Sequence, residues 1–325
     1  MRFDKNIRHA ASKSARAWSK VAARDQSGIP ACELPHVVNY LTLHCELIGY
    51  DTSVTQKIGG VDMTSPTTVV TGLRAKWGVS NCGQLMGTPT EAGLASIEPE
   101  GVYEHLAVGV LEEGYTLVYK TAPGGADHVK YDVYQSSSGI VCVDSHICRN
   151  DNSEFVKSTE SRTDDGLITI RQTFTVSKHT TRVIIRMEIT NCQKERSVDL
   201  TDFLVKRYAD IDVDTGGSAG WAGFQAYWDK TRYSVFSYNL DGDAPKDKRA
   251  HVVEMVAMPS DLALDEPFIG KLGSQQYNQR ANINPVAPGT KIDADGVLQW
   301  HADRFLAGEM LRINMYYDAF RSFAK

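Results

Sequence analysis

The sequence lacks several features that would assign it to a membrane or secreted class. No apolar run approaches the roughly 20 residues that a helix needs to cross a bilayer. The N-terminus carries a charge every few residues and has no apolar core of a secretory signal. Six cysteines in 325 residues are sparse, and no C-x-x-C motif occurs. This pattern excludes a disulfide scaffold and predicts free thiols in a cytoplasmic protein.

The sequence also lacks the short motifs of several enzyme classes. It contains no G-x-G-x-x-G after a predicted strand, no Walker A loop, no G-x-S-x-G elbow and no H-E-x-x-H. Nucleotide cofactors and the standard hydrolase triad are therefore not expected. Beyond residue 24 the chain is acidic, which would repel a nucleic acid, so we do not expect a nucleic-acid partner.

The charge is distributed unevenly along the chain. Residues 1–24 hold seven basic residues and one acidic residue, whereas the remaining chain holds 28 basic and 39 acidic residues. Over residues 3–24 the apolar residues fall on one side of a helix and the basic residues gather on the other. This cationic helix is predicted to cover a sheet edge, to bind an anionic partner or membrane surface, or to act as a transit peptide.

Most of the remaining chain shows β-strand patterns. Runs rich in β-branched residues and separated by turn residues follow one another without βαβ alternation. The sequence predicts an all-β protein, a large antiparallel β-sandwich over residues 51–325, preceded by a segment with one or two helices over residues 1–50. The clearest predicted strands are Leu167–Val176, Thr181–Thr190, Val198–Asp214, Phe224–Asp229, Arg232–Tyr238, Val252–Met258 and Met310–Tyr317.

One predicted strand has ionisable residues at every second position. Because successive side chains of a strand point to opposite faces, these residues share a face opposite Val205, Arg207 and Ala209. The carboxylates predict a calcium site, acid–base catalysis, or ion pairs with Lys206, Arg171 and Arg186. Arg171 and Arg186 are also candidates for binding a substrate. The residues on the predicted polar face are Lys206, Tyr208, Asp210, Asp212 and Asp214.

A second predicted strand places Cys142, Asp144, His146 and Cys148 at alternate positions. Thiolates and imidazole are good zinc ligands, but four residues along one straight strand span about 20 Å and cannot share one ion. A zinc site would need a ligand from a neighbouring strand, such as His128 or Asp132. The alternatives are a catalytic thiol paired with His146, or a buried polar layer with inert cysteines.

Histidine and aromatic residues supply the remaining candidates. His146, His251 and His301 are candidates for proton transfer at neutral pH. Trp221 follows a glycine-rich stretch, where its ring is a candidate platform for stacking against a sugar.

Two stretches, DLTDFLVKRYADIDVD and LQWHADRFLAGEMLRINMYYDAF, resemble the β-domains of bacterial carbohydrate-active proteins. In this class, which includes the galactose-mutarotase-like "supersandwich" domains, a strand ends in an acidic cluster and the last strand follows a turn of the L-x-P-G-E type. Here the turn Leu306–Glu309 lacks the proline. The resemblance covers about the last 170 residues and implies a fold, with no catalytic residue carried over.

Two functions are predicted. The first is an enzyme that acts on a sugar or similar polyhydroxylated molecule by proton transfer, as an epimerase, lyase or hydrolase, with Asp210, Asp212, His146 and Tyr208 as catalytic candidates. The second is a non-catalytic binding or self-assembling protein whose basic helix docks on an acidic surface. For both we expect a homo-oligomer; calcium on Asp210, Asp212 and Asp214 is the expected metal if one binds, ahead of zinc.

Overall fold

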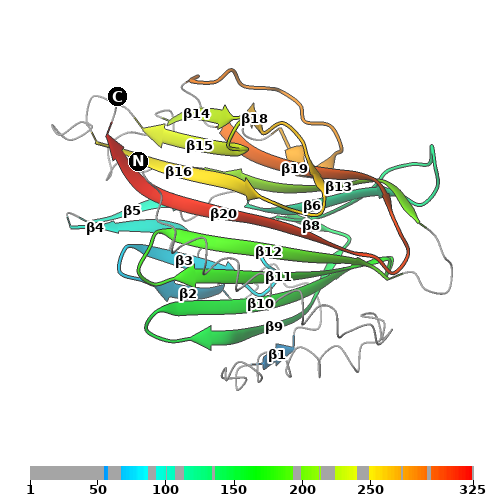
Figure 1. Ribbon diagram of the computed structural model, residues 1–325, viewed down its shortest axis with the longest axis horizontal. Coiled ribbons are helices and arrows are strands. Elements are labelled where there is room, and N and C mark those ends of the chain that lie inside the picture. The colour runs from blue at the N-terminus through cyan, green and yellow to red at the C-terminus, as the bar shows by residue number, and fades with distance from the viewer. Residues whose placement is uncertain are drawn as a thin grey trace, which may run out of the picture.

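The part of the chain that the computed structural model describes is built almost wholly of antiparallel β-strands (Figure 1). Within the part described, no helix is long and apolar enough to span a membrane. The predicted cationic helix at residues 3–24 lies outside this part. The structure describes residues 55–57, 67–86, 93–99, 101–106, 113–133, 136–192, 199–211, 213, 224–239, 249–271, 274–290 and 294–323.

The largest sheet has nine strands, and its long central strands are those with the strictest alternation of apolar and polar residues (Figure 1). On β11 and β12 every second side chain is buried, which confirms the two predicted strands in this region. The order across the sheet is β1 (Thr55–Lys57), β9 (Ile140–Asn150), β10 (Glu154–Thr163), β11 (Ile168–Ser177), β12 (Arg182–Asn191), β20 (Met310–Phe323), β16 (Arg249–Met258), β15 (Ser234–Asn239) and β14 (Phe224–Asp229).

The second sheet has seven strands. It contains the predicted strand of Lys206, Tyr208 and Asp210, which we call the acidic strand. Its order is β17 (Ala263–Leu264), β19 (Ala294–Phe305), β13 (Leu200–Asp210), β6 (Glu113–Lys120), β7 (His128–Val133) and β8 (Ser136–Ser138), and β18 (Phe268–Lys271) also pairs with β19. A single turn of 3-10 helix, η1 (Gln276–Asn278), lies in the segment between β18 and β19. A third sheet contains β2 (Thr67–Thr71), β3 (Ala75–Ser80), β4 (Leu94–Glu98) and β5 (Gly101–Leu106) in that order.

All three sheets contribute to one hydrophobic core. Phe174 and Met315 come from the nine-stranded sheet, Trp300 and Phe203 from the seven-stranded sheet, and Trp77 from the four-stranded sheet, and all five belong to one buried cluster. Each large side chain in such a core contributes about 1.5–3 kcal/mol through burial. The arrangement confirms a β-sandwich with large antiparallel sheets.

The cysteines differ from the prediction. Cys82 and Cys142 form a disulfide with a Cα–Cα distance of 5.3 Å, and Cys192 is disulfide-bonded as well. Cys148 is buried and remains a thiol. The prediction of free thiols throughout was wrong, because the fold brings together cysteines that lie 60 residues apart in sequence. The cytoplasmic location inferred from free thiols therefore loses its basis.

Candidate functional site

The alternation predicted for the acidic strand is confirmed on β13. Val205 and Ala209 belong to the main core, whereas Lys206 and Tyr208 point to the opposite, outer face of the seven-stranded sheet. There residues 276–281 cover them, since Tyr277 packs against Tyr208 with ring centroids 6.0 Å apart and Lys206 binds backbone carbonyls of this segment. The sheet therefore presents a polar outer face beneath a covering loop.

Two carboxylates lie side by side at one end of this outer face. Asp210 is the last residue of β13, and its partner across the antiparallel ladder is Asp295 near the start of β19. Residues directly opposite each other in such a ladder have Cβ atoms about 4.5–5.5 Å apart. Asp210 is 3% exposed and Asp295 is fully buried. Such a buried carboxylate pair can transfer protons or bind a cation.

Asp295 was missed by sequence reasoning. The pairing of β13 with β19 joins segments far apart in the chain, and no sequence pattern specifies that register. The acidic character of residues 293–295 was the available signal.

A cluster of tyrosines adjoins the carboxylate pair. Tyr208 lies two residues before Asp210, about 6.6 Å along the strand. The ring of Tyr277 packs between those of Tyr208 and Tyr131, with its centroid 5.0 Å from that of Tyr131. Tyr208 and Tyr277 are buried, and Tyr131 is half-buried. Tyrosine rings present an apolar face and a hydroxyl group, which together suit a polyhydroxylated ligand.

Lys206 fastens the covering loop to the sheet. Its Nζ donates hydrogen bonds to the backbone carbonyls of Gln276, Gln279 and Ala281, at 3.1, 2.9 and 3.3 Å. Burial lowers the pKa of Lys206 to about 7, and the charge of Arg280 adds to the shift. The described partners of Lys206 are therefore backbone carbonyls of one loop rather than carboxylates.

His301 lies further along the same outer face. Its Nδ1 is 2.6 Å from Asp265 Oδ1, and Gln299 Nε2 donates to the other oxygen of Asp265 at 2.5 Å. A carboxylate that orients an imidazole in this way is a common feature of proton-transfer sites. His301 is six residues from Asp295 on β19, about 20 Å along the strand. The two groups therefore cannot act on the same atom of a small substrate.

The structure places His146, Arg171 and Arg186 on the nine-stranded sheet, away from Tyr208 and Asp210. His146 Nδ1 lies 3.2 Å from Asp144 Oδ2. The two arginines pair with glutamates of their own sheet: Arg171 with Glu160 and Glu188, and Arg186 with Glu188. The structure therefore does not bring the predicted residues into one site, and the described ion pairs of both arginines involve no aspartate of β13.

The single polar face predicted for β9 was wrong. Cys142 lies opposite Ser161 of β10, whereas Asp144 lies opposite Glu160. Since Ser161 and Glu160 are consecutive, Cys142 and Asp144 point to opposite faces of the sheet. The cause is a register shift between Glu160 and Ser161, which inserts a bulge in β9 and reverses the alternation. Cys142 therefore points toward the interior, where it meets Cys82.

A buried polar network between the sheets was not predicted. Arg207 points inward from β13, and its Nε and Nη2 lie 2.7 and 2.5 Å from Glu113 Oε1. Tyr317 also donates to that oxygen, at 2.9 Å, and Gln172 Oε1 accepts from Arg207 at 2.8 Å. Burial lowers the pKa of Arg207, but the Glu113 carboxylate outweighs it and raises that pKa above its ordinary value.

Asp132 lies beside this network. Burial raises the pKa of its carboxyl to about 8, with Arg207 lowering it and Glu113 raising it further.

Three of the predicted site residues, Asp212, Asp214 and Trp221, lie outside the described residues. The calcium site on Asp210, Asp212 and Asp214 therefore stays a prediction.

Neither a protein-family model nor a curated protein matches this chain. Solved structures that resemble it include a bacterial glucoamylase complexed with acarbose, at a TM-score of 0.43 and 8% identity over 84% of this chain and 35% of that chain. Another is the galactosidase domain of an alpha-galactosidase–sucrose kinase, at a TM-score of 0.35 and 7% identity over 82% of this chain and 42% of that chain.

A galactose mutarotase related enzyme from Lactobacillus acidophilus is also similar, at a TM-score of 0.34 and 8% identity over 80% of this chain and 99% of that chain. The neighbours thus include the class of protein that the sequence resembles. This chain spans less than half of the first two structures. At TM-scores below 0.5 none of these likenesses bears on the activity of this chain.

Proposed function

We propose that this protein is an enzyme that acts on a carbohydrate or similar polyhydroxylated small molecule by general acid–base proton transfer. The site is the outer face of the seven-stranded sheet at the end of β13. The observation that supports it is the carboxylate pair Asp210 and Asp295, buried side by side and adjoined by the tyrosine cluster.

Each group has a chemical role in this proposal. One carboxylate takes a proton from the substrate and the other, protonated, returns one, as in other sites where two acids act together. Tyr208 lies next to the pair and can donate its hydroxyl proton to a sugar oxygen. The low dielectric of a buried site strengthens these interactions relative to water.

The spacing of the pair favours some reactions over others. Glycosidases that invert configuration need carboxylates about 6.5–9.5 Å apart to hold a water between them. Directly opposite residues of a ladder have Cβ atoms about 4.5–5.5 Å apart, so carboxyl groups that extend in parallel from such positions lie closer than this. The proposal therefore favours proton transfer at one centre of a sugar, or a retaining hydrolysis, over an inverting hydrolysis.

The test is a comparison of isosteric variants on a panel of sugars. Anomer exchange of aldoses would be followed by polarimetry and proton NMR, and cleavage of oligosaccharides by release of reducing ends. Asp210→Asn and Asp295→Asn should each lower kcat by about 10²–10⁴-fold, the usual contribution of a general acid or base. The matched control is Asp202→Asn, because Asp202 is exposed on the same strand and pairs with Lys120 at 2.7 Å.

Two results would overturn the proposal. One is an activity on a sugar that both variants retain in full while they remain folded. The other is binding of sugars, seen by saturation-transfer NMR, without turnover of any of them. That second result would support the alternative of a non-catalytic binding protein.

A further inference from the structure

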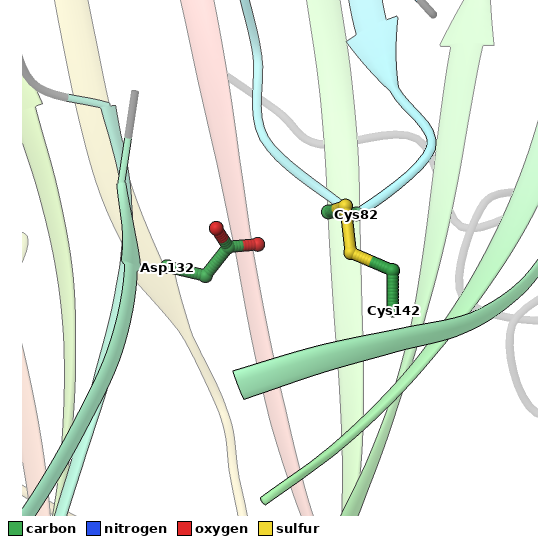
Figure 2. A group of neighbouring side chains, drawn as sticks. All are labelled: Cys82, Asp132 and Cys142. Atoms are coloured by element: carbon green, nitrogen blue, oxygen red, sulfur yellow. A yellow bond between two sulfur atoms is a disulfide. The ribbon is translucent and has the colours of Figure 1, made fainter. Parts of the chain in front are cut away.

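Cys82, Asp132 and Cys142 converge at the boundary between the three sheets. Cys82 lies in the turn after β3, Asp132 on the inner face of β7 and Cys142 on β9. Their sulfur atoms and a carboxylate oxygen all lie within 4.8 Å of one another. Figure 2 shows the side chain of Asp132 extending from its own strand toward the Cys82–Cys142 disulfide. Side chains from three separate elements thus meet at one point.

The carboxylate of Asp132 is held in a particular orientation. Its Oδ1 accepts a hydrogen bond from Gln84 Nε2 at 2.7 Å. Its Oδ2 is buried and makes no hydrogen bond with the described residues, and the residue as a whole is 5% exposed. A buried carboxylate oxygen without a donor is costly. A cation bound at Oδ2 would remove that cost, and the Gln84 amide would then orient a metal ligand as outer-shell groups do.

We propose that these three residues form a zinc site that is exclusive with the disulfide. In the oxidised protein the two sulfurs are bonded to each other. When a dithiol reduces that bond, the Cys82 and Cys142 thiolates and the Asp132 carboxylate bind one Zn²⁺. Two thiolates and a carboxylate suit zinc, and three protein ligands leave the fourth tetrahedral position for a water.

The chemistry balances in two steps. The dithiol gives two electrons and two protons to the disulfide, which becomes two thiols while the dithiol becomes a cyclic disulfide. Zinc then binds the two sulfurs and the Asp132 carboxyl group, with release of both thiol protons and of the proton that Asp132 carries below its pKa. No other oxidant or reductant is needed.

The local structure can accommodate the change. Two thiolates on one tetrahedral zinc lie about 3.8 Å apart, from Zn–S bonds of about 2.3 Å. Both cysteines are half-buried, so neither residue is fully enclosed by the sheets. Cys82 lies in a short turn whose amides at Cys82 and Gln84 donate to Ser80 Oγ, and rotation of its side chain lengthens the sulfur–sulfur separation.

This site is separate from the proposed sugar site. Asp132 and Tyr131 are consecutive on β7, so Asp132 points between the sheets while Tyr131 belongs to the tyrosine cluster on the outer face. A failure of either proposal therefore leaves the other unaffected.

The test measures metal binding by the full chain in both redox states. The protein would be reduced with dithiothreitol, desalted without oxygen and titrated with Zn²⁺ against a chromophoric chelator, and cobalt would report thiolate ligation by its charge-transfer absorption. We expect one zinc per chain with both thiolates bound after reduction, and at least a 100-fold weaker affinity in the oxidised protein.

Variants assign the ligands. Asp132→Asn should weaken zinc binding at least 10-fold, and Gln84→Ala about 10–100-fold through the outer shell. The Cys82→Ser/Cys142→Ser double variant should lose the thiolate–cobalt absorption, whereas Cys148→Ser, which alters a buried cysteine that forms no disulfide, should keep it. The exposed Asp164→Asn is the control for Asp132.

Three results would overturn the proposal: no zinc bound after reduction, the same affinity in the double cysteine variant, or the same affinity in Asp132→Asn. The last variant retains the disulfide until reduction, so it tests the site even if the double cysteine variant does not fold.

Discussion

The buried Arg207–Glu113 pair makes a quantitative prediction about stability. Arg207 is fully buried and Glu113 is 1% exposed. In Arg207→Met the aliphatic volume is kept but the charge is removed, which leaves the Glu113 carboxylate in the core. The backbone amide of Leu85 and the hydroxyl of Tyr317 remain as its donors, at 2.5 and 2.9 Å.

The size of the loss follows from the contacts that Arg207 makes. Its Nη1 donates to Gly83 O at 3.2 Å and to Gln172 Oε1 at 2.8 Å, and both acceptors would lose that donor. Removing one partner of a buried ion pair costs about 3–5 kcal/mol, because the other charge stays buried and unpaired. We therefore expect Arg207→Met to lower the free energy of unfolding by about 3–5 kcal/mol.

A double-mutant cycle by urea denaturation would check this value. Glu113→Gln keeps an acceptor for Leu85 and Tyr317, so the double variant Arg207→Met/Glu113→Gln should be more stable than Arg207→Met alone. The control is Arg182→Met, since Arg182 pairs with Asp318 at the surface and such pairs contribute about 0–1 kcal/mol. A loss in the free energy of unfolding below about 1 kcal/mol in Arg207→Met would refute the reasoning. So would a double variant whose loss exceeds the sum of the losses in the two single variants.

Two further predictions concern Lys157 and the disulfide. Burial lowers the pKa of Lys157 to about 7. Between pH 7 and about 10.5 the unfolded chain therefore binds a proton at Lys157 that the folded chain does not. As a result, Lys157 makes the free energy of unfolding rise with pH by up to about 1.4 kcal/mol per pH unit. Lys157→Met should remove this share of the rise in urea denaturation at several pH values, while the exposed Lys230→Met should leave it unchanged. Cys82→Ser/Cys142→Ser should lower the free energy of unfolding by roughly 4 kcal/mol in oxidising buffer, because the bond closes a loop of 60 residues; equal melting of the variant and the oxidised parent would contradict this.

The fold was predictable where one face of a strand is buried and the other is not. On β11 the residues Ile170, Phe174 and Val176 lie in the core and alternate with polar positions, so the period of two in the sequence specifies the strand and its facing side. The face of Lys206 and Tyr208 on β13 followed from the same rule. The prediction failed on β9, where a bulge shifts the register between Cys142 and Asp144, and no residue pattern marks that bulge.

The candidate site was predictable only in part, because its members come from distant segments. The sequence indicates that Tyr208 and Asp210 share a face, but the partner carboxylate Asp295 depends on which strand pairs with β13. The same holds for the disulfide, because Cys82 follows a strand of the four-stranded sheet and Cys142 lies on a strand of the nine-stranded sheet. Local patterns report the direction of a side chain, whereas long-range pairing decides what that side chain meets.

The alternation of β13 separates stability from the proposed activity. Arg207 points into the core and Asp210 points to the outer face, although only three positions separate them on one strand. Asp210→Asn is isosteric and removes a carboxyl group from the proposed site, so it should lower kcat by about 10²–10⁴-fold with little change in the contacts between the sheets. Arg207→Met should have the opposite effect, lowering the free energy of unfolding while the folded fraction keeps its activity. If both variants lose stability and activity together, the two faces of β13 are coupled, and the carboxylate pair then belongs to the structural framework of the sandwich.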